Sequence, residues 1–227
     1  MRDDQVHKTS AITGIAGAVI LFIGTLLHPL QADPNDPQAA FIEYASHDSW
    51  VAVHLIQLFG IALIIFSLVL LSKIIASGKT ETWAQLGTVG ATASLAIAIA
   101  LQAVDGVALK VMVDHWAIAQ STDKEILFYA AFGVRQIEVG LASMLSLILG
   151  ITAGIYGIAQ NSHRDFPAWL GWLAILGGLS TTVAGIVMAE TGFSNTAMLI
   201  NMPANFLLLI WITLTGIWVW KMTPMSN

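Results

Sequence analysis

The sequence alternates between six long apolar segments and short polar connections. A helix needs about 20 apolar residues to cross the ~30 Å hydrocarbon layer of a bilayer, because its backbone polar groups must be satisfied internally where water is absent. Each of the six segments reaches about this length. We therefore expect an all-α integral membrane protein, a six-transmembrane-helix bundle forming one domain over residues 1–227, with approximate spans 11–30, 50–72, 83–113, 126–159, 168–190 and 197–220.

The composition supports a membrane protein and excludes several other classes. Hydrophobic residues make up 56% of the chain and charged residues only 10%, whereas soluble domains carry about 25% charged residues. The net charge is −5 and the sequence contains no basic run, which argues against a nucleic-acid partner. Because the chain contains no cysteine, a bound metal or cofactor must be held by nitrogen or oxygen ligands.

Basic residues are distributed unequally between the two ends of the predicted helices. Lysine and arginine concentrate at cytoplasmic ends of membrane helices, so their distribution predicts orientation. Here they favour an arrangement with both termini in the cytoplasm of a prokaryotic-type plasma membrane. The cations on the N-terminal side of the predicted bilayer are Arg2, Lys8, Lys73, Lys79, Arg164 and Lys221.

Polar residues within the spans gather at one depth, near the opposite end of the helices. A charged group in a span costs about 2.5 to 3.5 kcal/mol on insertion scales and tends to face the protein interior or a wet cavity. The pattern predicts a polar pocket open to the extracytoplasmic side, or polar groups lying at the outer water interface. The residues are His28, Gln31, His54, Gln57, Gln102, Asp105, Arg135, Gln136, Glu138, Glu190, Asn201 and Asn205.

The third and fourth spans are expected to form an antiparallel hairpin with its turn near residue 120. Residues equally far from the turn lie at the same level, and Asp105 and Arg135 are each 15 positions away. We therefore predict a structural ion pair between Asp105 and Arg135, since a buried arginine requires a partner.

Two histidines are the strongest candidates for a functional site. His28 and His54 lie at similar depth on neighbouring spans, and neutral imidazole is the commonest metal ligand and an axial ligand of haem. Glu138 and Glu190 could complete a shell for zinc, iron, manganese or copper, whereas two histidines alone would suit haem b. Gln57 follows His54 by three residues and shares its helical face.

These residues predict a metal- or haem-binding membrane protein, with a redox enzyme or a hydrolase as the expected class of activity. A site near the lipid headgroups would suit a lipid or quinone substrate, oriented by Asn201, Asn205 and Gln57. The sequence identifies no catalytic residue. Two other functions stay open: a small-solute or proton-coupled transporter, and a non-catalytic subunit that binds a partner protein.

Overall fold

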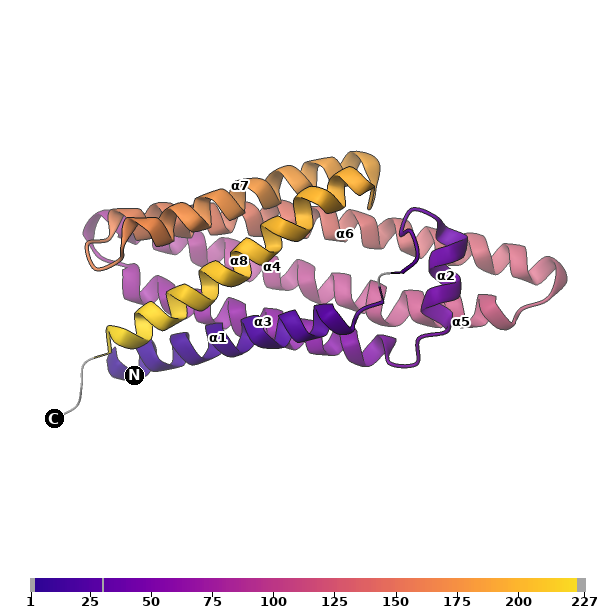
Figure 1. Cartoon of the computed structure of the whole chain (residues 1–227), viewed down its shortest axis with the longest axis horizontal. Coiled ribbons are helices and arrows are strands. Elements are labelled where there is room, and N and C mark those ends of the chain that lie inside the picture. The colour runs from indigo at the N-terminus through magenta and orange to yellow at the C-terminus, as the bar shows by residue number, and fades with distance from the viewer. Residues whose placement is uncertain (1–2, 30, 224–227) are drawn as a thin grey trace.

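The computed structural model describes residues 3–29 and 31–223, which form a bundle of long helices without a β-strand (Figure 1). In chain order the elements are α1 (Asp3–Leu27), α2 (Pro37–Ala45), α3 (Trp50–Ile75), the 3-10 helix η1 (Gly78–Thr80), α4 (Glu81–Gln102), the π-helix η2 (Ala103–Leu109), α5 (Lys110–Ile118), α6 (Ser121–Ser162), α7 (Ala168–Thr191) and α8 (Asn195–Lys221).

Within the described residues, six helical segments are long and apolar enough to cross a membrane, which confirms the number expected from the sequence. Four of them have 24 to 27 residues, but Gly78–Ile118 has 41 and Asp123–Ser162 has 40. At 1.5 Å per residue the longer pair extends about 60 Å and the others about 36 to 40 Å. The hairpin of α5 and α6 therefore projects beyond the rest of the bundle, at the right of Figure 1.

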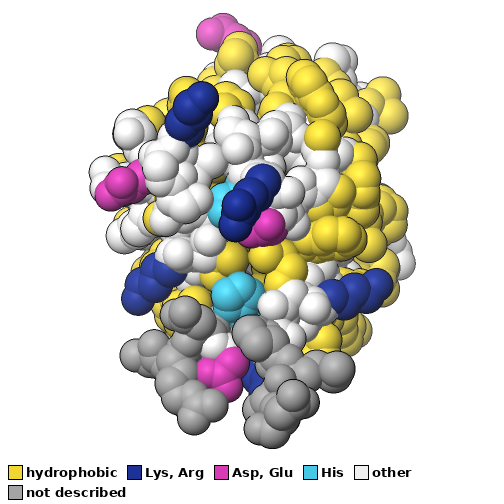
Figure 2. Space-filling view, turned by 90° about the vertical axis from the view of Figure 1, so that its left-hand side faces the viewer, with side chains coloured by type: hydrophobic (Ala, Val, Ile, Leu, Met, Phe, Trp, Pro, Cys, Tyr) yellow, Lys and Arg dark blue, Asp and Glu magenta, His cyan; other side chains and the backbone are white. Residues whose placement is uncertain are grey.

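α1 begins and α8 ends at the same end of the bundle, on the left of Figure 1. Figure 2 looks onto this end and shows lysine and arginine side chains spread among other polar groups. We call the opposite end, where α2 lies, the α2 end. The charged face in Figure 2 and the α2 end are thus separated by the length of the spanning helices.

The connection between the first two spans contains α2, a helix that the sequence analysis did not predict. Asp36 caps this helix, because its Oδ1 accepts hydrogen bonds from the backbone N–H groups of Gln38 and Ala39 at 3.1 Å each. Pro37 occupies the first helical position, where its fixed φ fits and no N–H is needed. The Asp-Pro dipeptide is therefore the local signal that starts α2.

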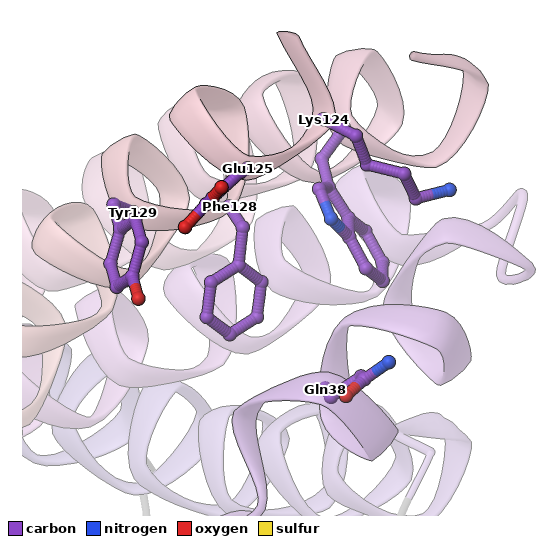
Figure 3. Close-up of a pocket in the computed structure, with 6 residues that line it drawn as sticks. Gln38, Lys124, Glu125, Phe128 and Tyr129 are labelled. Atoms are coloured by element: carbon purple, nitrogen blue, oxygen red, sulfur yellow. The ribbon is translucent and has the colours of Figure 1, made fainter. Parts of the chain in front are cut away.

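α2 packs on the projecting hairpin through a small apolar core of its own. The members of this core are Ala40, Phe41, Tyr44, Trp50, Leu109, Val113, Trp116 and Ala131. At its edge lies an open hollow lined by Gln38, Trp116, Lys124, Glu125, Phe128 and Tyr129. Figure 3 shows Phe128 pointing from α6 into this hollow, with Gln38 of α2 across from it.

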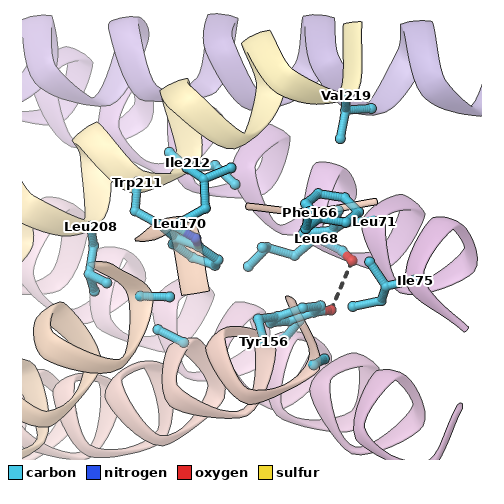
Figure 4. Close-up of a cluster of buried hydrophobic side chains, with 14 of the residues drawn as sticks. Leu68, Leu71, Ile75, Tyr156, Phe166, Leu170, Leu208, Trp211, Ile212 and Val219 are labelled. Carbon is cyan, nitrogen blue, oxygen red and sulfur yellow. Dashed lines mark hydrogen bonds between the residues drawn. The ribbon is translucent and has the colours of Figure 1, made fainter. Parts of the chain in front are cut away.

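The main apolar core occupies the other half of the bundle and joins α1, α3, α4, α6, α7 and α8 (Figure 4). Tyr156 is fully buried there, and its hydroxyl donates a 2.8 Å hydrogen bond to the carbonyl oxygen of Leu68. Small residues let the helices approach closely, as expected for membrane bundles. A Cβ at Gly150, for example, would lie 2.5 Å from the carbonyl oxygen of Gly178.

Candidate metal centre

Three elements meet at the α2 end and bring together two histidines and an aspartate. His28 directly follows α1, which stops there because a residue before proline disfavours the helical conformation. His54 lies in the first turns of α3, and Asp105 lies in η2. The ring centroids of His28 and His54 are 5.1 Å apart, and His54 Nε2 lies 3.0 Å from Asp105 Oδ2.

One potential ligand atom from each of these three residues lies within 4.8 Å of the other two. We call His28, His54 and Asp105 the triad. The structure therefore places the two histidines against each other, as the sequence led us to expect. Asp105, assigned to an ion pair in the sequence analysis, joins them instead of either glutamate.

The π-helix η2 presents Asp105 to α3. Its wider turn adds a residue to the helical repeat, and such segments frequently occur at functional sites. Gly106 allows the close approach, since a Cβ at this position would lie 2.6 Å from the Cβ of His54. Trp50, one turn before His54 on α3, also holds the segment by donating its indole N–H to the carbonyl oxygen of Asp105 at 3.0 Å.

Backbone carbonyls fix how both imidazoles are oriented. The Nδ1 atom of His28 lies 2.8 Å from the carbonyl oxygen of Pro29, and that of His54 lies 2.8 Å from the carbonyl oxygen of Trp50. Because a carbonyl oxygen only accepts, Nδ1 must carry the hydrogen in both rings, and Nε2 then has the free lone pair when the ring is neutral. Metal-bound histidines typically make this second hydrogen bond.

The centre contains more hydrogen-bond acceptors than donors. Asp105 Oδ1 and Gln102 Oε1 are two of the four buried side-chain atoms in the described part of the chain that lack a partner. A neutral His54 also directs its Nε2 lone pair at a carboxylate oxygen. Two acceptors at 3.0 Å repel, so this contact requires a proton shared by the two groups or another cation.

Aromatic rings enclose the two histidines. Trp50 is 1% exposed, and the centroid of its ring lies 4.6 Å from that of His54 and 4.9 Å from that of His28. The ring of Tyr44 packs against that of Trp50, with the centroids 4.2 Å apart and the ring planes tilted by 38°. Burial lowers the pKa of His28 below its usual 6.5, and the neighbouring His54 shifts the pKa in the same direction. His28 therefore favours the neutral form that binds metals.

The predicted ion pair between Asp105 and Arg135 is replaced by two other pairs among the described residues. Arg135 donates to both carboxylate oxygens of Glu138, at 2.7 and 2.6 Å, whereas Asp105 contacts His54. Counting from the turn assumed regular α-helices throughout the hairpin. The π-helix changes the rotation about the helix axis, so that Asp105 faces α3 instead of α6.

Arg135 also ties two connections together at the α2 end. Its Nη2 donates to the carbonyl oxygen of Pro34 at 3.2 Å, and its guanidinium lies over the rings of Phe193 at 4.8 Å and Tyr44 at 5.5 Å. Pro34 belongs to the segment that follows His28 along the chain. The buried pair with Glu138 therefore helps to hold the connection that carries one histidine of the triad.

The other predicted site residues do not join the triad in this structure. Glu138 is committed to Arg135, and Glu190 is exposed at the end of α7. Asn205 donates to Asn201 on the same helix at 2.9 Å. Gln57 accepts a long hydrogen bond, 3.5 Å, from Gln102 Nε2. Only Gln57, one turn from His54, thus remains adjacent to the centre.

Of the polar residues at this depth, His54, Gln102, Arg135 and Glu138 are buried within protein, whereas Gln31, Gln136 and Glu190 are exposed. His54 is 2%, Glu138 3% and Arg135 5% exposed.

Comparisons with protein-family models, with curated proteins and with solved structures found no match. The function must therefore be inferred from the residues of the site.

Proposed function

We propose that this multi-pass membrane protein binds a divalent transition-metal ion through His28, His54 and Asp105. The observation that supports this most is the surroundings of His54, whose two ring nitrogens both face acceptors. A cation between Nε2 and the carboxylate would turn this repulsion into coordination. Two imidazoles and one carboxylate suit zinc, iron(II) or manganese(II).

The spacing of the triad favours an ion over haem b. A porphyrin bound by two histidines must lie between the two rings. Here the ring centroids are 5.1 Å apart, and Trp50 packs against both rings. The three ligand atoms within 4.8 Å of one another need a small shift to surround a single ion, whereas a porphyrin would require the helices to separate.

The alternative occupant of the same contact is a proton, shared between His54 Nε2 and the carboxylate of Asp105. Glu138 and Arg135 neutralise each other, so the surrounding charge leaves Asp105 to be balanced by one of these two cations. The two alternatives differ in a measurable property, the metal content of the purified protein.

The proposed ion would lie at the edge of the hydrocarbon layer, because the apolar span of α1 ends at Leu27, directly before His28. The basic residues at the other end of the bundle support N- and C-termini in the cytoplasm and a site on the extracytoplasmic side. Three protein ligands leave a coordination position open, as in hydrolytic zinc sites and non-haem iron enzymes. Hydrolysis or redox chemistry on a lipid or quinone depends on that position being free.

A transport function has less support. A transporter needs a polar route from the site to the opposite end of the bundle. The main apolar core occupies that half of the bundle. Figure 4 shows some of its side chains, including Leu68, Leu71, Tyr156, Trp211 and Ile212. The polar groups buried there, such as the Tyr156 hydroxyl, are held by hydrogen bonds between helices.

Metal analysis of the purified full-length protein tests the proposal. The protein is purified in detergent, loaded with zinc, iron(II), manganese(II) or copper(II), desalted and analysed by mass spectrometry. We expect a single retained ion per chain in the wild type, and loss of that ion in His54→Ala and Asp105→Asn. His115→Ala removes an exposed histidine of α5 and serves as the matched control. A wild type that retains none of these metals refutes the proposal.

A further inference from the structure

Gln102 lies beside the triad on the same helical face as Asp105. It is the last residue of α4, three positions before Asp105, and both side chains contact α3, since Asp105 meets His54 and Gln102 meets Gln57. Gln57 stands in the same relation to His54 on α3. The pairs His54–Asp105 and Gln57–Gln102 therefore form two successive polar rungs between α3 and the α4–η2 segment.

The amide of Gln102 has one end satisfied and the other end free. Its Nε2 donates to Gln57 Oε1, whereas its Oε1 has no hydrogen-bond partner although the residue is only 9% exposed. The oxygen and nitrogen of an amide point apart from their shared carbon. With the nitrogen turned toward Gln57, the oxygen turns away from that rung. A buried acceptor without a donor is costly, and a bound cation would satisfy it.

We propose that Gln102 Oε1 is the fourth ligand of the ion held by the triad. This inference rests on the proposed metal function and adds a ligand to it. Two imidazole nitrogens, one carboxylate oxygen and one amide oxygen form an N₂O₂ set that suits zinc, cobalt(II), iron(II) or manganese(II) and disfavours copper(I). It also gives the otherwise unpaired Gln102 oxygen a partner.

A fourth protein ligand closes the coordination sphere. Four-coordinate sites made wholly of protein ligands are typical of structural zinc, whereas catalytic sites keep a position for water or substrate. The ion then joins the end of α1 to α3 and η2, and substrate chemistry would require Gln102 to leave.

Cobalt(II) spectroscopy on the detergent-solubilised full-length protein tests the fourth ligand. Cobalt(II) absorbs much more strongly in a tetrahedral site than in a five- or six-coordinate one, so the visible spectrum reports the coordination number. Spectra are compared for the wild type, Gln102→Leu, Gln102→Glu and the control Gln136→Leu, which changes an exposed glutamine of α6. Azide is then added to each protein as a probe for an open position.

We expect an intense four-coordinate spectrum that azide does not change in the wild type and in Gln136→Leu. Gln102→Leu should retain cobalt with a weaker affinity and give a spectrum that azide shifts, while Gln102→Glu should restore an azide-insensitive site. If azide shifts the wild type as it shifts Gln102→Leu, or if Gln102→Leu leaves the spectrum unchanged, Gln102 is not a ligand and the three-ligand site stands. If the wild type gives no protein-bound cobalt spectrum, the inference fails together with the proposed function.

Discussion

Replacing Arg135 by methionine should destabilise the protein strongly. Both side chains of the Arg135–Glu138 pair are buried, and two hydrogen bonds of 2.7 and 2.6 Å join them. Removing one partner of such a pair leaves the other charge buried and costs about 3 to 5 kcal/mol. The cation–π contacts with Tyr44 and Phe193 add about 0.5 to 1 kcal/mol each.

The double variant Arg135→Met/Glu138→Leu separates the charge effect from the loss of packing. Replacing both members by apolar residues of similar volume is often close to neutral, so the double variant should be more stable than Arg135→Met alone. Its remaining deficit should reflect the lost contacts with Tyr44, Phe193 and the carbonyl of Pro34.

The assay is reversible unfolding in mixed detergent micelles, with far-UV circular dichroism as the probe and all four members of the double-mutant cycle measured together. The cycle should give a coupling free energy of about 2 to 3 kcal/mol or more between Arg135 and Glu138. Additive effects of the two single substitutions would refute the assignment of this pair, because they would mean that neither charge depends on the other.

Three further predictions concern the metal centre. Gly106→Ala places a methyl group 2.6 Å from the Cβ of His54 and should weaken zinc binding about tenfold or more in a competition titration, since a loss of about 1.4 kcal/mol in binding free energy is enough. The control Gly133→Ala, whose added Cβ meets no atom within 4 Å, should leave the zinc affinity unchanged. Equal zinc affinities of the two variants would contradict the close approach of Gly106 to His54. In metal-free protein the free energy of unfolding should fall as the pH drops below 6.5, because the pKa of His28 is lower in the folded protein and the unfolded chain takes up the proton first. His28→Gln should flatten the dependence of the unfolding free energy on pH in this range. An unchanged slope in the variant would show that His28 does not cause the loss of stability. Adding a chelator should lower the unfolding free energy of zinc-loaded protein by about 2.7 kcal/mol when the free zinc concentration before chelation is 100 times the Kd. The unfolding free energy of Asp105→Asn should not change on adding the chelator.

The spanning helices followed from the sequence, but the elements around them did so less completely. The first span was expected to begin near residue 11, whereas α1 already begins at Asp3, because a helix can continue past the apolar stretch into water. The short α2 was not predicted, although Asp36 and Pro37 carry a recognisable start signal. Its apolar face became visible only through its packing on the hairpin.

The sequence by itself determined the six apolar helices and the depth of each polar residue along them, because backbone satisfaction in lipid sets the length of a span and residue count sets the depth. It thereby brought His28 and His54 to one level. Which way each side chain faces was decided by the tertiary structure. Each residue rotates the helix by about 100°, and the π-helix η2 turned Asp105 from Arg135 to His54. Packing around Gly106 and Trp50 fixes that rotation, so the triad arises from contacts between helices that no single segment encodes.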